Sequence, residues 1–279
     1  YQRTQRMPEY LLPEGNVLIS FSGGRTSGYM LHKILEENGG LPDRCKVLFA
    51  NTGREMSQTL DFVHECGDRW NVPIKWLEYD RIDNKVTFKE VSHNSAARNG
   101  EPFETLLYKP YLPNAVARFC TAELKVRTIK RYLVSQKWKH WNSGIGIRAD
   151  EPRRINRGDS RDRWTFWYPL ADAGATKATV MDFWKQQPFD LRLFGPNGVT
   201  AKGNCDGCFL KSEATLAMMW REHPDRMEWW SAMEKKIGGT FHKRRSYDDV
   251  GNFVKRQGDW IFNEEVGALC QEDDGECTG

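Results

Sequence analysis

Two short stretches of this sequence hold residue types that can do chemistry. The first joins two glycines to hydroxyl side chains and a guanidinium, in the order Ser22, Gly23, Gly24, Arg25, Thr26 and Ser27. Glycines let a backbone approach a ligand closely, and the amides at a helix start favour an anion such as phosphate or sulfate. The second is Cys205-Asp206-Gly207-Cys208, whose two thiols can chelate a metal or form a redox pair.

The cysteine count favours metal or redox chemistry over a disulfide framework. There are seven cysteines, at positions 45, 66, 120, 205, 208, 270 and 277. The number is odd, the chain is long, and its first residues lack the apolar stretch of a signal peptide. No apolar run approaches the roughly 20 residues that span a membrane. We therefore expect a cytoplasmic protein without a membrane segment, in which Cys45 and Cys66 are inert buried thiols.

Composition and charge narrow the class of protein. The chain has 279 residues, 39% of them hydrophobic, which is enough to bury a core and excludes disorder as the main state. Lys and Arg number 41 against 38 Asp and Glu, a balance that excludes a bulk nucleic-acid coat. Basic residues cluster locally, in two groups: Lys125, Arg127, Lys130 and Arg131, then Arg148, Arg153, Arg154 and Arg157.

Hydrophobic patterning predicts the elements that position these residues. Strands are expected at 16–21, 46–50, 74–79 and 143–148, and helices at 27–38, 57–70, 114–137, 179–187 and 212–236. Residues 81–113 are expected to be irregular. Alternating strands and helices predict an α/β fold, a Rossmann-like parallel sheet with helices on both faces. We place a boundary near 195–205, giving a larger α/β domain over 1–200, which holds the glycine loop, and a smaller helical, cysteine-bearing subdomain over 201–279.

Three segments carry a resemblance to a known family. Residues 22–27 resemble the PP-loop, Ser-Gly-Gly-x-Asp-Ser, of the adenine-nucleotide α-hydrolases, with Thr26 in place of Asp. Asn51, Thr52 and Gly53 resemble the Asp-Thr-Gly segment of phosphoadenylyl-sulfate (PAPS) reductases, with Asn51 in place of Asp. Residues 146–148 resemble the family's Gly-x-Arg segment. Over residues 16–210 the chain is identified as a member of the PAPS reductase-like branch of the PP-loop superfamily, which includes phage and DNA-modification relatives.

The resemblance implies an adenine nucleotide, either ATP or a sulfonucleotide, bound with Mg²⁺. Its contacts would come from the glycine loop, the segment after the second strand and the arginine segment. The expected nucleotide-binding residues are Ser22, Gly23, Gly24, Arg25, Thr26, Ser27, Asn51, Thr52, Gly53, Arg148, Arg153 and Arg154.

The resemblance also implies a cysteine-ligated centre. Cys120 precedes a Leu-Lys helix, as in the iron–sulfur members of the family, and Cys205 and Cys208 would supply two further ligands. Cys270 is our candidate for the fourth, although Cys277 or an open iron site are alternatives. A [4Fe–4S] cluster is favoured over zinc or an unligated redox dithiol. Cys277 is also a catalytic candidate, since it follows Glu276 as in the family's mobile nucleophile, but the Gly-x-His of that motif is absent.

These features favour an enzyme of sulfur transfer or sulfur reduction, a transferase or an oxidoreductase. ATP would adenylate an acceptor oxygen that sulfur then displaces, or a thiolate would attack a sulfonucleotide and release sulfite. One alternative is an ATP-dependent component of DNA or tRNA thiolation, which would involve a nucleic-acid acceptor and a sulfur-donor protein. Another is a non-catalytic nucleotide sensor, suggested by Thr26 and Asn51. The acceptor, the sulfur donor and the oligomeric state stay open.

Overall fold

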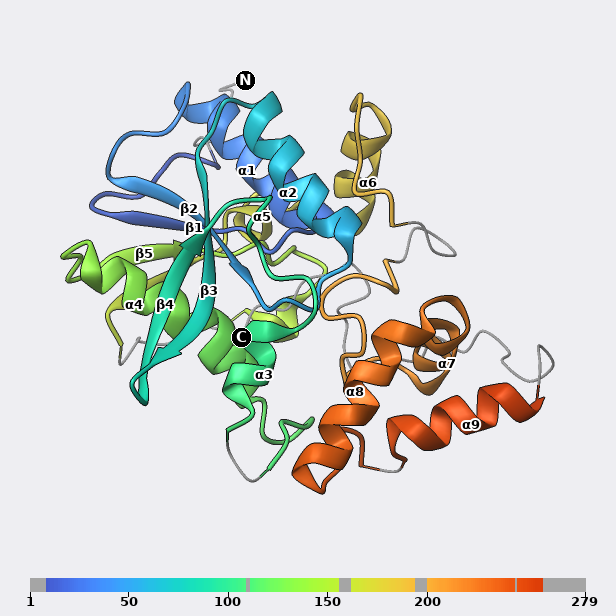
Figure 1. The fold of residues 1–279 in the computed structure, drawn as a ribbon. Helices are drawn as coiled ribbons and strands as arrows, with labels where there is room; N and C mark the ends of the chain where they lie inside the picture. Colours follow the sequence, from blue (N-terminus) through green and yellow to red (C-terminus); the bar gives the residue numbers. More distant parts are fainter. Residues whose placement is uncertain (1–8, 109–110, 156–161, 194–199, 244, 258–279) are drawn as a thin grey trace.

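The computed structural model describes residues 9–108, 111–155, 162–193, 200–243 and 245–257. Within them the strands form one six-stranded sheet of order β4-β3-β2-β1-β5-β6 (Figure 1). Neighbouring strands run parallel except β3 and β4, which pair antiparallel at one edge. The strands are β1 (Val17–Ser20), β2 (Cys45–Asn51), β3 (Ile74–Ile82), β4 (Lys85–Val91), β5 (Trp141–Gly144) and β6 (Trp164–Trp167).

Helices cover both faces of the sheet, as the sequence predicts. On one face α1 (Arg25–Asn38), α2 (Ser57–Arg69) and α6 (Lys177–Lys185) pack in the larger apolar core, which includes Ile19 and Phe49. On the other face α4 (Thr128–Ser135) covers the sheet through Ile129 and Leu133. Strands that are apolar on both sides are typical of a parallel sheet buried between helical layers.

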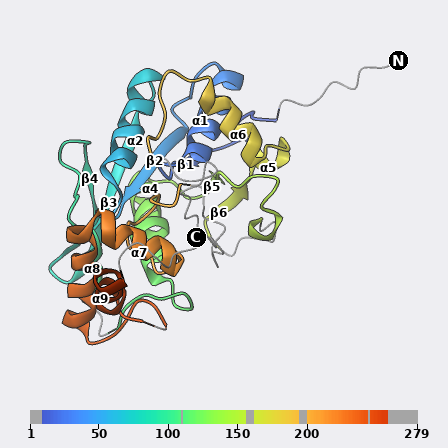
Figure 2. The ribbon, with the colours of Figure 1, turned by 90° about the vertical axis from the view of Figure 1, so that its right-hand side faces the viewer.

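The C-terminal helices form a group of their own beyond the carboxyl edge of the sheet. Figures 1 and 2 show α7 (Glu213–Glu222), α8 (Pro224–Ile237) and α9 (Tyr247–Gln257) together, with α3 (Glu101–Leu106) beside α8. Phe103 of α3 packs edge-on against Trp230 of α8, with ring centroids 5.1 Å apart. Two shorter helices, η2 (Pro152–Arg154) and α5 (Pro169–Asp172), flank β6 in the chain.

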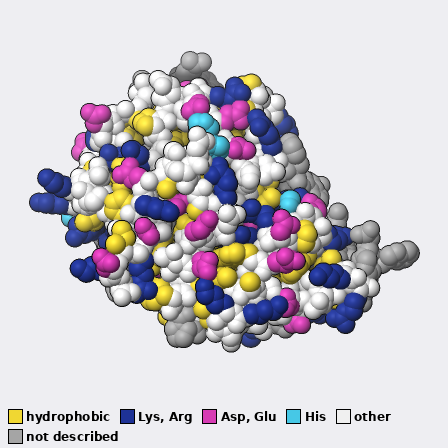
Figure 3. Space-filling view, in the orientation of Figure 1, with side chains coloured by type: hydrophobic (Ala, Val, Ile, Leu, Met, Phe, Trp, Pro, Cys, Tyr) yellow, Lys and Arg dark blue, Asp and Glu magenta, His cyan; other side chains and the backbone are white. Residues whose placement is uncertain are grey.

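The outer surface carries mixed charge. Figure 3 shows basic and acidic side chains interspersed over the face of the molecule seen in Figure 1, without a broad field of one sign. This pattern agrees with the near-balanced composition. Among the residues that the structure describes, no helix has the length and apolar character needed to cross a membrane.

The prediction that residues 81–113 are irregular is wrong. The chain turns back after β3 and forms β4, then later α3. Asp83 and Asn84 make the turn with φ of 48° and 63°, the left-handed backbone of a two-residue hairpin. Asp-Asn is a weaker turn signal than Asn-Gly. β4 lies at the sheet edge and carries several charged residues, as exposed edge strands commonly do, which hides its apolar alternation.

The other helix and strand predictions also need correction. No helix occupies 114–118, because the Asn114 carboxamide oxygen accepts the amides of Val116 and Ala117 in a local turn. The helical run begins at Phe119 and has wide, π-type turns in η1 (Thr121–Arg127) before α4. The stretch 212–236 divides into α7 and α8 at Pro224, where a proline begins a new helix. Strand β6 and helix α9 were not predicted.

Candidate nucleotide site and thiol cavity

The strand order reverses between β1 and β5. From β1 the chain continues to β2 and β3 on one side, whereas β5 and β6 lie on the other. In open α/β sheets, ligands bind outside the carboxyl ends of the strands at such a switch point. The loop of residues 22–27 follows β1, and the segment leading to Arg148 follows β5, so two of the three predicted binding segments meet at this position.

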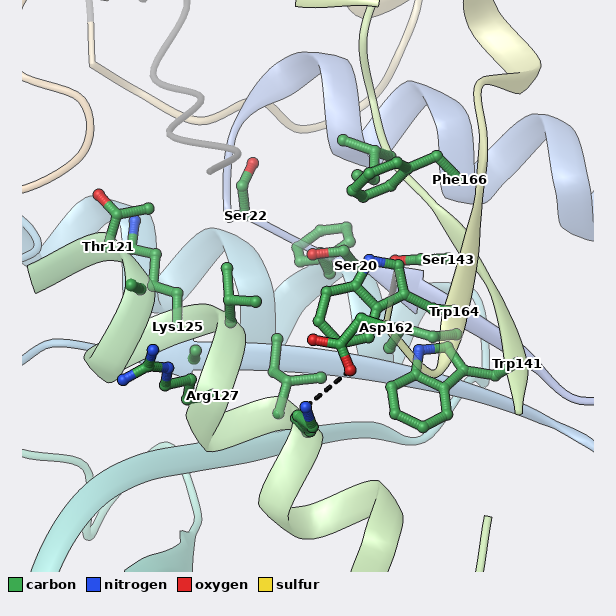
Figure 4. Close-up of a pocket in the computed structure, with 18 of the residues that line it drawn as sticks. Ser20, Ser22, Thr121, Lys125, Arg127, Trp141, Ser143, Asp162, Trp164 and Phe166 are labelled. Carbon is green, nitrogen blue, oxygen red and sulfur yellow. Dashed lines mark hydrogen bonds and ion pairs between the residues drawn. The ribbon is translucent and has the colours of Figure 1, made fainter. Parts of the chain in front are cut away.

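A cavity of about 640 Å³ opens at this switch point. Figure 4 shows Thr121, Lys125 and Arg127 of η1 on one side. The rings of Trp141, Trp164 and Phe166, from β5 and β6, lie on the other. The two tryptophan rings stack with centroids 5.6 Å apart. The cavity therefore has a cationic side and an aromatic side, and its volume is typical of small-molecule sites.

The charge of the cavity favours an anion. Among the described residues, four cationic side chains line it, against one carboxylate, Asp162, which pairs with Lys130 at 2.7 Å. The cations are Arg118, Lys125, Arg127 and Lys130. Three of them, Lys125, Arg127 and Lys130, belong to the first basic cluster of the sequence. Arg131, the fourth member of that cluster, pairs with Glu123 at 2.9 Å, and Arg127 pairs with the same carboxylate.

The glycine loop folds against its own helix. Gly23 has φ of 84°, and a Cβ there would lie 2.7 Å from Thr59, so this position requires glycine. The Ser27 hydroxyl accepts the amides of Ser22 and Gly24, each over 3.3 Å. Ser22 is the residue of this loop that lines the cavity, on the side of the sheet where η1 lies.

Arg25 has a structural partner. Its guanidinium donates to both carboxylate oxygens of Asp190, over 2.7 and 2.6 Å, and to the Thr200 hydroxyl over 3.0 Å. Its carbonyl accepts the indole N–H of Trp184. The Arg25 side chain thus joins the start of α1 to the segment after α6, rather than lining the cavity.

Arg148 links the two strand-end segments. Its guanidinium donates to the Thr26 hydroxyl over 3.3 Å and to Asp150 over 2.9 Å, and it is buried. Thr26, in the position where the family pattern has Asp, therefore contacts an arginine of the predicted Gly-x-Arg segment. In η2, Arg153 is exposed and Arg154 donates to Glu151 over 2.5 Å. Neither arginine lines the cavity.

Asn51 is part of a buried polar group at the end of β2. Its amide nitrogen donates to Glu78 over 2.6 Å and to the Ala97 carbonyl over 2.9 Å. Its carbonyl oxygen accepts the amide of Gly53, whose φ is 78°. Glu78, fully buried on β3, supplies the carboxylate here, with Lys89 3.0 Å away. Asn51 shapes the turn between β2 and α2 rather than facing the cavity.

Three predicted metal-ligand cysteines surround one small cavity. Cys120, Cys205 and Cys208 all line a space of about 20 Å³, together with Thr52 and Asn204. Cys205 reaches the end of β2 through an isolated antiparallel bridge to Glu55. The thiol cavity therefore lies beside the β2 segment. The fourth predicted ligand, Cys270, and the catalytic candidate Cys277 fall outside the described residues.

Cys205 lies in a polar but enclosed environment. Its Sγ is 3.3 Å from the Thr52 hydroxyl, which donates to both oxygens of Glu55 over 2.9 Å. Burial raises the pKa of the Cys205 thiol well above its ordinary value, and Glu55 adds to this effect. Lys125 and the Thr52 hydroxyl act in the opposite direction. The thiol is thus protonated at neutral pH in the absence of a ligand.

Asp206, between the two cysteines, fixes the position of their loop. It is fully buried and accepts bonds from Arg54 over 2.7 Å, from Trp230 over 2.6 Å and from Arg226. Its own amide donates to the Arg54 carbonyl over 2.9 Å. Because Arg226 and Trp230 belong to α8, this carboxylate joins the β2 segment, the cysteine loop and the C-terminal helices.

The described residues do not form a complete metal-binding site. Thiolates are suitable ligands for iron–sulfur clusters and zinc. Yet 20 Å³ is about the space of one water molecule, far less than a four-iron cluster needs. In the part of the chain that the structure describes, no three His, Cys, Asp or Glu side chains are grouped closely enough to hold a metal. A cluster would require this cavity to open.

The two cavities share one helical wall. Arg118, Thr121 and Lys125 line both of them. The aromatic side of the larger cavity was missed from the sequence, although Trp164 and Phe166 alternate on one face of β6, which is the strand signal that would have found them. A nucleotide in the larger cavity and the thiols of the smaller one would thus lie on either side of η1.

The fold and the cavity at the switch point define an open α/β protein of the nucleotide-binding class. The family model of the phosphoadenosine phosphosulfate reductase domain matches residues 16–161. The chain belongs to this family. The match includes β1 to β5, the glycine loop and η1, so it covers most of the larger cavity.

Two phage proteins are similar in sequence. "Uncharacterized nin region protein ORF290" of Escherichia phage lambda is 28% identical over 212 residues, which cover 74% of this chain and 69% of that protein. "Uncharacterized 37.8 kDa protein in gpa 5'region" of Escherichia phage 186 is 28% identical over 164 residues, 48% of each chain.

Among solved structures, the U34-tRNA thiolase NcsA from Methanococcus maripaludis, with its [4Fe-4S] cluster, aligns over 88% of this chain and 83% of its own. The TM-score is 0.41 and the sequence identity 11%.

Proposed function

We propose that this protein is a PP-loop enzyme that binds an adenine nucleotide in the 640 Å³ cavity and uses it in sulfur chemistry beside the thiol cavity. The observation that carries the proposal is the shared wall, since Arg118, Thr121 and Lys125 line both spaces. Membership of the PAPS reductase family supports an adenine nucleotide, ATP or a sulfonucleotide, as the ligand.

The two sides of the cavity suit the two ends of a nucleotide. The base would stack against Trp141 and Trp164, since aromatic rings bind any base by its face. The phosphate or sulfate groups would lie toward Ser22, Lys125 and Arg127, where hydroxyl and cationic groups donate charge-assisted hydrogen bonds. In this orientation the reactive end of the nucleotide is nearest the thiol cavity.

Mg²⁺ would be held mainly by the nucleotide itself. It prefers carboxylate and phosphate oxygens. Asp162 is the carboxylate among the described residues that line the cavity, and it pairs with Lys130. Thr26 replaces the family's Asp and contacts Arg148. The chain therefore neutralises phosphate charge chiefly with Lys and Arg side chains.

Binding is tested by calorimetry with ATP, with PAPS and with AMP. We expect ATP or PAPS to bind, and the variant Lys125→Ala to bind at least tenfold more weakly, because a charge-assisted hydrogen bond contributes about 1.5–3 kcal/mol. Lys139→Ala, an exposed lysine outside the cavity, is the matched control. The proposal fails if neither nucleotide binds, or if both variants bind like the wild type.

Anaerobic assays then separate the reactions. ATP–pyrophosphate exchange indicates adenylation, whereas release of sulfite from PAPS indicates reduction. Binding without either reaction indicates a nucleotide sensor. Iron and zinc assays on anaerobically purified protein test the metal centre. A cluster ligated by Cys120, Cys205 and Cys208 predicts that Cys205→Ala loses metal, whereas metal-free active protein would assign these cysteines to thiol chemistry.

A further inference from the structure

The helix that lines both cavities has an irregular pitch. In η1 (Thr121–Arg127) the backbone makes wide turns, with hydrogen bonds to carbonyls five residues back, and it continues directly into α4. Cys120 and Thr128, at the two ends of η1, both keep right-handed helical backbone angles. The run is therefore one continuous helix with a wide segment in its first half, a feature that is frequent at functional sites.

Thr128 lies where the wide turns end. Its amide donates to the Lys125 carbonyl, only three residues back, so the regular ladder is interrupted here. Its hydroxyl donates to the Glu123 carbonyl, five residues back, over 2.8 Å, and Thr128 is fully buried. A hydroxyl bonded to a backbone carbonyl in this way replaces a regular helical hydrogen bond. The Thr128 side chain thus stabilises the change of pitch.

The change of pitch decides which residues face the two cavities. Ile129 and Leu133 anchor α4 against the sheet, whereas Leu124 of η1 is buried in the larger apolar core. The pitch between these two anchors therefore sets how the N-terminal half of the helix is rotated relative to α4. If the wide turns lost their one extra residue and became regular α-helix, the N-terminal half would rotate by about 100° around the helix axis. Such a rotation would carry Lys125 and Thr121 away from the wall that both cavities share.

We propose that Thr128 is a positioning residue, whose hydroxyl holds the wide turns of η1 and so keeps Lys125 between the nucleotide cavity and the thiol cavity. The effect on ligand affinity rests on the function proposed above. The effect on the helix itself does not, because it concerns only the conformation of residues 119–128.

The test compares four proteins: the wild type, Thr128→Val, Thr128→Ser and Thr105→Val. Valine removes the hydroxyl at nearly constant shape, and serine restores it. Thr105 is the matched control, because its hydroxyl also donates to a helical carbonyl, that of Glu101, over 2.9 Å, but in the exposed part of α3. Each protein is titrated with ATP and with PAPS by calorimetry.

We expect about tenfold weaker nucleotide binding in Thr128→Val, and wild-type binding in Thr128→Ser and Thr105→Val. In a Lys125→Ala background, Thr128→Val should have no further effect, since the threonine acts through that lysine. An equal loss in both backgrounds would indicate a general loss of stability and would overturn the proposal. Unchanged binding in Thr128→Val would overturn it as well.

A readout without nucleotide keeps the two proposals apart. Cys120 is buried at the start of the helical run, so rotation of this half should expose it. Alkylation by iodoacetamide, measured site by site with mass spectrometry, should be several-fold faster at Cys120 in Thr128→Val than in Thr105→Val. If the wild type binds no nucleotide, the proposed function fails, and the alkylation rate of Cys120 then tests the positioning role by itself. Equal rates in Thr128→Val and Thr105→Val would contradict that role.

Discussion

The two cavities on either side of η1 differ in almost every physical respect. The larger holds about 640 Å³, and the part of its lining that the structure describes includes four cationic side chains and a stacked tryptophan pair. The smaller holds about 20 Å³, and within it the Sγ of Cys205 lies 3.3 Å from the Thr52 hydroxyl. The first arrangement suits a ligand that enters from solvent and leaves again, whereas the second keeps a few protein groups in one geometry.

Charge has a different role on each side. In the larger cavity Lys130 pairs with Asp162, and both side chains are partly exposed, so the pair contributes little to stability. Beside the thiols, Arg54 and Asp206 are only 3% and 0% exposed. A buried charge that loses its partner is costly, so these residues determine stability. We infer that charges in the open cavity determine ligand affinity, and charges near the thiols determine folding.

The largest expected effect is on the thiol side. Asp206→Ala leaves the buried Arg54 and the adjoining Arg226 without their carboxylate, and should lower the free energy of unfolding by about 3–5 kcal/mol. Urea denaturation measures it. Asp182→Ala, an exposed ion pair on α6, should cost less than about 0.5 kcal/mol. Equal stability of the two variants would contradict the inference that charges near the thiols determine folding. So would an Asp206→Ala variant that is as stable as the wild type and loses only nucleotide affinity.

A second test concerns the acid at the ends of β2 and β3. Asn51→Asp restores the family's aspartate but places it against buried Glu78, 2.6 Å from the present amide. Two carboxylates here repel each other, so we expect a loss of about 2–3 kcal/mol in the free energy of unfolding at pH 8. Adding Glu78→Gln should recover most of the stability. If the two substitutions instead lower the free energy of unfolding additively, the amide and the carboxylate cannot replace each other at these two positions.

In the larger cavity, replacement of an aromatic ring should have a smaller effect, on nucleotide affinity. Trp164→Leu keeps an apolar side chain but removes stacking with the base, which contributes about 1–3 kcal/mol. ATP affinity should fall about tenfold. Inorganic triphosphate, which has no base, should bind wild type and variant within twofold of each other. Equal losses for both ligands would place the base elsewhere in the cavity.

The parts of the site that the sequence predicts are local in the chain. The Ser-Gly-Gly loop after β1 is recognisable because a strand, glycines, hydroxyls and a helix follow in order, and the structure confirms that Gly23 needs its positive φ. The parallel sheet with two helical layers was also predicted. Cys205 and Cys208 stand out through their spacing, and the structure brings Cys120 to the same cavity.

The parts that the sequence does not predict depend on partners far along the chain. Arg25 looks like an anion ligand until Asp190, 165 residues later, pairs with it. The role of Asp206 depends on Arg54, 152 residues earlier. The wide turns of η1 have no pattern of their own, because the same residues would also fit an α-helix. These features depend on tertiary contacts, which local sequence patterns do not reveal.

The last test concerns whether a raised thiol pKa marks function or only burial, through a change that is small at pH 8 and grows with pH. Burial raises the pKa of Cys45, at the start of β2 and far from both cavities in the fold's core, to about 12. An unfolded cysteine ionises near about 8.5, so the folded state binds more protons between these values. The stabilisation is complete below about pH 8.5 and falls by up to about 1.4 kcal/mol per pH unit above it.

The measurement is urea unfolding under reducing conditions at pH 8, 9 and 10. The free energy of unfolding should fall less steeply with pH in Cys45→Val than in the wild type. Cys205→Ala should reduce the slope too, since that thiol is also buried, but only Cys205→Ala should abolish turnover. Loss of turnover in Cys45→Val would mean that the thiol cavity is not the site where sulfur chemistry is confined.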